Sequence, residues 1–394
     1  ERERGQEVND FQNFVFKNGH LNFNISNLVS RPDIGRVIDG VAGIQMGTSV
    51  SSAGDVNKDG FEDFLVGARY ASSNGKVFLV FGKPRAQSFS PLFSKNLSSG
   101  AMIEIVGEAI NDNFGCSVGS GDFNSDGTSD ILIGAVSVPA NTGQAYVIFG
   151  HAGTWQASIS ASSIGSAVAG VKFVGSVGSL AGGSVSHAGD VNSDGQEDLI
   201  IGATGMTPQG GTKVGAAFLV FGRNSSVWPS TMNLSTLSLP DGVTILGMST
   251  NSYFGESVSG GFDLNGDSTS DVVIGAWAVN SNTGQAVVIF GKKSKDDWKS
   301  GTFDTSNTSQ FDGKIGTIIL GESTNTNCGR VVSGSGDANG DGIDDVLVCS
   351  PWWTNGASTS AGRCHLVFGK PESHWTATLP LSAIDGTNGI TLDG

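Results

Sequence analysis

Short apolar runs recur along this chain, and residues typical of turns separate them. From residue 43 onward the runs are four to six residues long and rich in Val, Ile and Phe, with Gly, Ser, Asn and Asp between them. Runs of that length match β-strands, and the intervening residues favour tight turns. Consecutive strands joined by tight turns pair antiparallel. The pattern therefore predicts an all-β protein made of antiparallel sheets.

The runs form five repeating units of four. In every unit the second run ends in small residues and the third ends in Phe-Gly: FLVGA and VFLVFG, ILIGA and AYVIFG, LIIGA and AFLVFG, VVIGA and AVVIFG, VLVCS and CHLVFG. One four-stranded sheet cannot bury both of its faces, and radial stacking of such sheets into a β-propeller solves that problem. We predict one β-propeller domain over 1–394, with four-stranded blades at approximately 43–110, 111–178, 179–250, 251–324 and 325–394.

The residues before the first unit contain half of another. FVFKNG at 14–19 resembles a third run, and RVIDG at 36–40 resembles a fourth. We expect 1–42 to supply strands that close the propeller, either by supplementing the last blade or as a partial blade. In the other interpretation the natural chain continues past Gly394. The predicted number of blades is therefore five to seven.

A nine-residue segment between the first and second runs carries the clearest chemistry. Its copies are DVNKDGFED at 55–63, DFNSDGTSD at 122–130, DVNSDGQED at 190–198, DLNGDSTSD at 263–271 and DANGDGIDD at 337–345. Oxygen-bearing side chains stand at positions 1, 3, 5 and 9, and position 7 offers a backbone carbonyl, which is the order of ligands in a calcium loop. The fourth copy has Ser268 where the others have Gly. Asp, Asn and Gly also favour ordinary turns, but that explains one copy better than five.

We therefore predict about five structural Ca²⁺ ions. The side-chain ligands would be Asp55, Asn57, Asp59 and Asp63; Asp122, Asn124, Asp126 and Asp130; Asp190, Asn192, Asp194 and Asp198; Asp263, Asn265, Asp267 and Asp271; and Asp337, Asn339, Asp341 and Asp345. The backbone carbonyls would be those of Phe61, Thr128, Gln196, Thr269 and Ile343.

The charge of the chain fits these loops. With 22 Lys and Arg against 37 Asp and Glu, the formal net charge is −15. Three ligand carboxylates crowded into each loop repel one another unless a cation is bound. The acidic balance excludes nucleic acid, whose phosphates would be repelled, as an expected partner. No run of 18 apolar residues is present, so we expect no transmembrane segment.

These motifs resemble the FG-GAP repeat of integrin α-subunit propellers. The Phe-Gly pair stands at Phe114-Gly115 and Phe254-Gly255, and the Gly-Ala end at Gly67-Ala68, Gly134-Ala135, Gly202-Ala203 and Gly275-Ala276. The fifth unit departs from the pattern with Cys349-Ser350-Pro351. The resemblance implies an extracellular adhesion or recognition module, secreted or at the cell surface, with calcium between the first two strands of a blade. Related propellers also occur in lectins and as accessory parts of hydrolases and lyases.

Strand order predicts where a ligand would bind. In an antiparallel blade the loops after the first and third strands share one face, and the loops after the second and fourth strands share the other. The second face holds our candidate ligand residues, Tyr70, Trp277, Trp352 and Trp353, whose alternative role is packing. Because these loops are unequal, we expect one asymmetric site for an extracellular protein or cell-surface ligand. A glycan-binding lectin is the alternative. No catalytic constellation is visible, so we do not expect an enzyme.

Two further sets of residues carry structural predictions. Cys349 ends the second run of the fifth unit and Cys364 begins the third. Neighbouring antiparallel strands could bring these cysteines into bridging range, although two small buried thiols are the alternative. A Trp recurs shortly after the third run in four units, and we expect it to pack between blades: Trp155, Trp228, Trp298 and Trp375.

Overall fold

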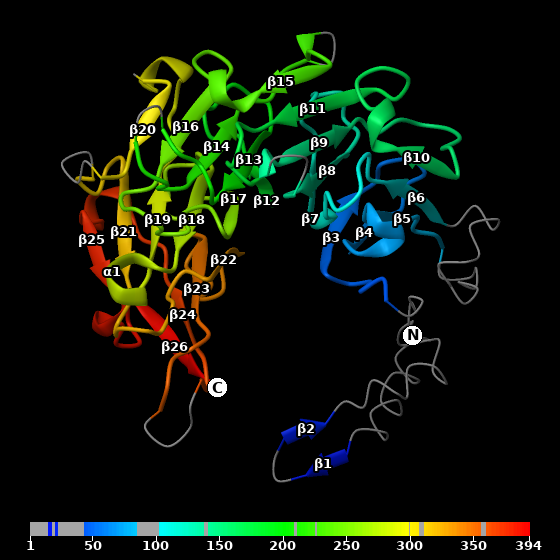
Figure 1. Ribbon diagram of the computed structural model, residues 1–394. Coiled ribbons are helices and arrows are strands. Elements are labelled where there is room, and N and C mark those ends of the chain that lie inside the picture. Colours follow the sequence, from blue (N-terminus) through cyan, green and yellow to red (C-terminus); the bar gives the residue numbers. More distant parts are fainter. Residues whose placement is uncertain are drawn as a thin grey trace, which may run out of the picture.

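Five sheets, each built on four antiparallel strands, follow one another around an arc (Figure 1). The computed structural model describes residues 15–17, 20–22, 43–84, 102–137, 141–208, 211–224, 227–298, 300–306, 311–355 and 360–394. The first strands of successive units, β3 (Ser49–Gly54), β7 (Phe114–Gly121), β12 (Ala181–Gly189), β17 (Val258–Phe262) and β22 (Val331–Gly336), pack side by side in that order. Within the described residues no comparable packing joins β22 back to β3. The blades of a β-propeller are present, and this part of the ring is open.

Each unit supplies four antiparallel strands in chain order, as predicted. After the first strands named above, the remaining ones are β4 (Asp63–Ala68), β5 (Lys76–Val80) and β6 (Met102–Val106); β8 (Asp130–Ala135), β9 (Gln144–Ile148) and β11 (Gly170–Val174); β13 (Asp198–Ala203), β14 (Ala216–Val220) and β16 (Gly242–Leu246); β18 (Asp271–Ala276), β19 (Gln285–Ile289) and β21 (Gly316–Leu320); and β23 (Asp345–Ser350), β24 (Arg363–Val367) and β26 (Gly389–Asp393).

Four sheets contain a fifth strand that the sequence pattern did not predict. The following unit donates it, and it pairs parallel with the outermost strand. The donated strands are β10 (Ser158–Ser160), β15 (Thr231–Asn233), β20 (Thr302–Asp304) and β25 (Thr378–Pro380). Each has three residues and a single central apolar or aromatic side chain, which is too short for a periodic signal.

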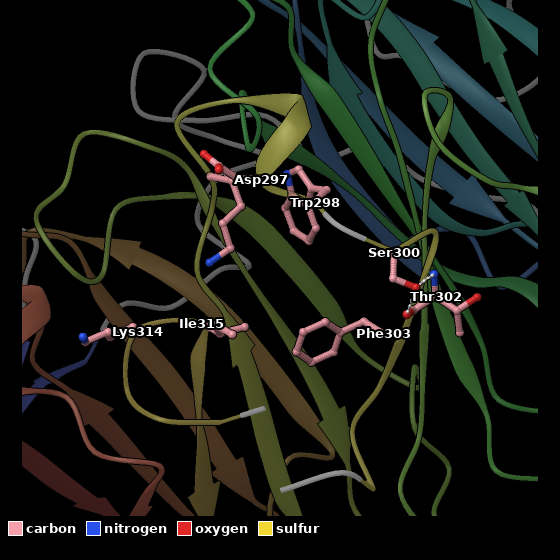
Figure 2. A pocket seen from close by; sticks show the side chains of 8 residues that line it. Asp297, Trp298, Ser300, Thr302, Phe303, Lys314 and Ile315 are labelled. Carbon is pink, nitrogen blue, oxygen red and sulfur yellow. Dashed lines mark hydrogen bonds between the residues drawn. The ribbon is translucent and has the colours of Figure 1, made fainter. Parts of the chain in front are cut away.

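Figure 2 shows the donated strand of the fourth unit from close by. Thr302 and Phe303 of β20 lie near Trp298, and the hydroxyl of Ser300 donates to the backbone oxygen of Thr302 at 2.8 Å. A pocket of about 460 Å³ opens beside them, and Lys314 and Asp297 also line it. None of the predicted ligand residues lines this pocket, so it adds nothing to the site predicted from the sequence.

The hydrophobic core lies between neighbouring sheets. Four clusters of buried side chains fill the spaces from the first sheet to the fifth, each drawing residues from two sheets. This arrangement explains the Gly-Ala end of the repeat. A Cβ added at Gly134 would lie 2.0 Å from the carbonyl oxygen of Gly182 in the next blade, and one added at Gly275 would lie 1.9 Å from that of Gly329. Only glycine permits this approach between blades.

The remaining elements are short. The helical turns are η3 (Ala71–Ser73), η6 (Ala161–Ser163), η8 (Leu234–Thr236), α1 (Val279–Asn282), η9 (Lys295–Asp297), η11 (Glu372–His374) and η12 (Leu381–Ala383). Near the N-terminus, β1 (Val15–Lys17) pairs antiparallel with β2 (His20–Asn22). The predicted third-run strand at 14–19 thus overlaps β1. The predicted strand at 36–40 lies outside the described residues.

Candidate metal loops and the opposite face

The five acidic loops have one hydrogen-bonding pattern. In the first loop the carboxylate of Asp55 accepts from the backbone N–H of Asp59 at 3.0 Å and from that of Gly60 at 2.8 Å. The carboxylate of Asp59 accepts from the N–H of Phe61 at 3.0 Å. The same three bonds recur in every loop. The loop with Ser268 keeps them, with Ser268 at φ 67°. The repeated nonapeptide therefore gives one repeated loop.

The ninth residue of each loop connects the loop to the third strand of its own blade. One oxygen of Asp63 accepts from the N–H of Val56 at 3.1 Å, and the other accepts from the N–H of Gly82 at 2.7 Å. All five units repeat both bonds. The second donor is always the Gly of the Phe-Gly that ends the third run: Gly82, Gly150, Gly222, Gly291 and Gly369. Sequence reasoning found these glycines but missed this role, and their invariant place in the repeat was the available signal.

The loops also bind neighbouring blades to each other. The carbonyl oxygen of the second loop residue accepts from a backbone N–H just after the Phe-Gly of the next blade. These pairs are Val56 with His151 at 2.9 Å, Phe123 with Arg223 at 3.2 Å, Val191 with Lys292 at 2.7 Å, and Leu264 with Lys370 at 3.1 Å. The loop after the first strand and the one after the third therefore share a face, as predicted. Whatever orders a loop also orders the junction to the next blade.

Each loop concentrates negative charge around a buried carboxyl group. Burial raises the pKa of Asp63 to about 6 and that of Asp130 to about 8. The Asp residues at positions 1 and 5 of the same loop raise each pKa further. Burial likewise raises the pKa of Asp198, Asp271 and Asp345. Backbone N–H donors oppose the shift in every case, and burial outweighs them. A bound cation would remove this penalty.

The oxygen atoms of these loops are of the kind that bind a hard cation. In this structure the side-chain oxygens accept hydrogen bonds from the backbone of their own loop. Within the described ranges, no three His, Cys, Asp or Glu side chains stand together as a formed metal site. Their oxygens instead accept the backbone bonds described above. In the third loop, Oδ1 of Asn192 and Oε1 of Gln196 are buried without any hydrogen-bond donor. Oxygen atoms from carboxylates, amides and carbonyls are the ligands that Ca²⁺ takes.

The opposite face carries a row of aromatic and arginine side chains across the fourth and fifth sheets. The ring of Tyr253 stacks on Trp277 with 4.4 Å between centroids. The guanidinium of Arg330 lies 4.8 Å from the centre of Trp277 and 5.6 Å from that of Trp352. Glu256 lies 3.6 Å from Arg330. Tyr253 and Trp352 are 38% and 44% exposed, whereas Trp277 is half-buried between its neighbours. Sequence reasoning named two of these residues and missed Tyr253 and Arg330.

The other two predicted ligand residues contact different arginines. Trp353 is covered by Arg363, whose guanidinium lies 3.6 Å from the ring centre and bonds to Asp393 at 2.6 Å. Tyr70 follows β4, in the sheet at the other end of the arc, and is 46% exposed beneath the guanidinium of Arg69. Of the four predicted aromatics, Trp277 and Trp352 share a contact with Arg330, and Trp353 and Tyr70 contact Arg363 and Arg69.

The fifth unit also contains a disulfide. Cys349 and Cys364 face each other in the register of β23 and β24, with 4.1 Å between their Cα atoms, and a disulfide joins them. The recurrent tryptophans pack against the blades, as expected. Trp155, Trp228 and Trp375 each donate their indole N–H to a backbone carbonyl oxygen, at 3.2, 3.2 and 2.8 Å. These residues stabilise the scaffold.

No helix in the described part of the chain has the length and apolar character needed to cross a membrane. The model of the FG-GAP repeat matches residues 46–80, 114–148 and 254–289. These are the first, second and fourth units. In the third and fifth units, Ala181 and Cys328 stand where the second and fourth units have Phe114 and Phe254, before the first strand's Gly. Both are fully buried at the same place in the fold. The sheets are thus more alike than their sequences.

Curated relatives share part of the chain. Integrin alpha-4 of Xenopus laevis is 26% identical over 242 residues, which is 61% of this chain and 20% of the relative. Integrin alpha-5 of Xenopus laevis is 30% identical over 58% of this chain. Phosphatidylinositol-glycan-specific phospholipase D of Bos taurus is 32% identical over 44% of it. The chain spans about a fifth of the length of these relatives. Three of its units match the FG-GAP repeat, and the chain is similar to integrin α-subunits.

Proposed function

We propose that this chain is an extracellular recognition module that binds a protein ligand through the face opposite the acidic loops. The observation that carries the proposal is the row formed by Tyr253, Trp277, Arg330 and Trp352. Trp, Tyr and Arg are the residues that most often dominate binding energy at protein interfaces. Because Tyr253 and Arg330 already contact its ring, Trp277 supports this row and Tyr253 and Trp352 present the exposed surface.

The same row favours a protein over a sugar as the ligand. A sugar-binding site typically offers an aromatic face for stacking, but Trp277 and Trp353 each have a neighbouring group over the ring. Arg330 and Glu256 add a cation and an anion beside the aromatic rings. A patch with both charges and aromatic edges suits the mixed surface of a protein.

Calcium is the second part of the proposal. Each acidic loop would hold one Ca²⁺ through the side chains at positions 1, 3, 5 and 9 and the carbonyl at position 7. The buried ninth carboxyl supports this, since a cation would offset the burial, and the neighbouring carboxylates, that raise its pKa. The bonds from the loops to the next blade would let bound calcium stabilise the whole arc. Its role would be structural.

The proposed setting is the cell surface or the extracellular space, and the proposed activity is binding without catalysis. The similarity to integrin α-subunits supports this setting. The similarity to a phospholipase D covers 20% of that enzyme. If this chain belonged to a larger enzyme, it would therefore have an accessory role there.

The test is binding of the purified chain to a combined array of extracellular proteins and glycans, in calcium and in chelator. We expect calcium-dependent binding to one or a few proteins. The paired changes Tyr253→Ala and Trp352→Ala should abolish it, while Tyr70→Ala, at the other end of the arc, should leave it unchanged. Binding to a defined class of sugar with equal loss in the Tyr70→Ala variant would contradict the proposal.

A further inference from the structure

The third acidic loop differs from the other four in the position of its Asn side chain. In those four, the amide oxygen of the third loop residue accepts from the backbone N–H of the fifth, at 2.9 to 3.0 Å. Asn192 instead directs its amide N–H to Asp198, at 3.1 and 3.3 Å from the two carboxylate oxygens. Asn192 is 1% exposed, and its own side-chain oxygen is buried without a donor. The third loop therefore holds its predicted ligands in a different arrangement.

A lysine from the next blade accompanies this difference. Lys295 begins η9, and its ammonium forms an ion pair with the carboxylate of Asp194, the fifth residue of the loop. The same ammonium lies 5.6 Å from the ring centre of Phe221. Among pairs of described residues, no ion pair reaches a predicted ligand carboxylate in the other four loops. The third loop thus has a cation of the protein's own on one of its predicted ligands.

The fourth loop receives the opposite charge at the equivalent place. The segment that follows the Phe-Gly of the next blade lies against each of these two loops. Three residues before the recurrent Trp, this segment has Lys295 beside the third loop and Glu372, the first residue of η11, beside the fourth. Burial lowers the pKa of Lys292, and Glu372 opposes that shift together with the fifth and ninth Asp of the fourth loop. Glu372 therefore lies in the electrostatic environment of the fourth loop.

We propose that Lys295 is a built-in counter-ion of the third loop and makes this loop the weakest of the five calcium sites. The inference rests on the calcium part of the proposed function. For calcium to bind there, Asp194 must exchange an ammonium group for the ion, and Asn192 must turn away from Asp198. Neither change is needed in the fourth loop, where the Asn keeps the common arrangement and Glu372 adds negative charge. The fourth loop should therefore fill at a lower calcium concentration than the third.

Hydrogen exchange measured by mass spectrometry resolves the two loops. We expect calcium to protect 263–271 at a concentration roughly tenfold below the one that protects 190–198, because a fixed charge beside a site changes its affinity for a cation. Lys295→Glu should lower the midpoint of 190–198 by roughly tenfold and leave that of 263–271 unchanged. Glu372→Lys should raise the midpoint of 263–271. Lys293→Glu is the matched control, because it makes the same change of charge at an exposed residue two positions away.

The outcomes separate this inference from the function on which it rests. Equal midpoints for the two loops would overturn the inference and leave calcium binding intact. An equal shift in Lys293→Glu and Lys295→Glu would overturn it as well, since the effect would then come from net charge alone. Calcium protection absent from all five loops would instead remove calcium from the proposed function, and the ranking of the sites with it.

A second variant tests the counter-ion without any calcium. In chelator, Lys295→Met should speed exchange of the amides in 190–198 roughly fivefold, because the three carboxylates of the loop lose the cation that offsets their repulsion. Lys293→Met should change this exchange little. If exchange in 190–198 is the same in Lys295→Met and in the unchanged chain, Lys295 is not the counter-ion of the third loop, whatever calcium does.

Discussion

The two faces of the arc are built from the same repeat and differ in how much they vary. On the face of the acidic loops, five units repeat the same side-chain bonds, down to the two acceptors of the ninth Asp. On the opposite face, the residue after the second strand is Arg69, Val136, Thr204, Trp277 or Pro351. One face is a repeated scaffold. The other differs from blade to blade, and there the aromatic row lies on two blades only.

This difference separates stability from recognition. A contact repeated in every unit contributes to stability at every junction between blades, because each repeat is stabilised mainly by its neighbours. A contact made once can change without loss of the fold. Perturbing the loop face should therefore alter stability strongly, and perturbing the opposite face should alter binding alone.

Removal of calcium should have the largest effect. If five sites are filled, chelation removes the stabilisation that each ion contributes, about 2.7 kcal/mol at a concentration one hundred times its dissociation constant. We expect the melting temperature to fall by about 10 °C or more. Differential scanning calorimetry in calcium and in chelator measures this, with magnesium added back as the control. An unchanged melting temperature would remove the calcium part of the proposed function.

The next largest effect should come from the glycines between blades. Gly134→Ala places a Cβ 2.0 Å from the carbonyl oxygen of Gly182, so two backbones must separate. We expect a loss of roughly 3 kcal/mol. Gly119→Ala is the matched control, since the nearest atom to its Cβ would be 3.6 Å away. Chemical denaturation compares the two. Equal stability of both variants would show that the blades tolerate a wider spacing.

The acidic loops should also give stability a pH dependence that calcium reverses. Without metal, the pKa of Asp63 is about 6 and that of Asp130 about 8, both above the unfolded value near 3.8. Between the unfolded pKa and the folded pKa of each group, the folded state holds more protons than the unfolded state. Stability therefore falls as the pH rises from about 5 to about 8. Calcium needs ionised carboxylates, and saturating calcium should make the protein more stable at the higher pH. Thermal melts at both pH values, with and without calcium, test the sign.

The sequence predicted what repeats and failed where an element occurs without a pattern of its own. Five copies of the nonapeptide and of the Phe-Gly run were enough to place the strands and the loops. The donated strands escaped because three residues with one central apolar or aromatic side chain, such as Ser158–Ser160, show no period. The aromatic row was found only in part. Trp277 and Trp352 drew notice as tryptophans, whereas Arg330 becomes significant only once the fold places it between them.

The smallest effect on stability should come from Arg330. Its cation–π contacts with Trp277 and Trp352 are half-exposed, and contacts of that kind contribute about 0.5–1 kcal/mol. Arg330→Met keeps the length of the side chain and removes the charge, so the melting temperature should move by no more than a degree or two. Binding of the protein ligand should nevertheless weaken by roughly tenfold or more, since the guanidinium holds the two tryptophans in one row. Arg223→Met is a suitable control, because Arg223 lies over Trp228 at 4.7 Å on the loop face. If Arg330→Met lowers stability as much as Gly134→Ala does, the two faces share one role, and the distinction between scaffold and recognition surface fails.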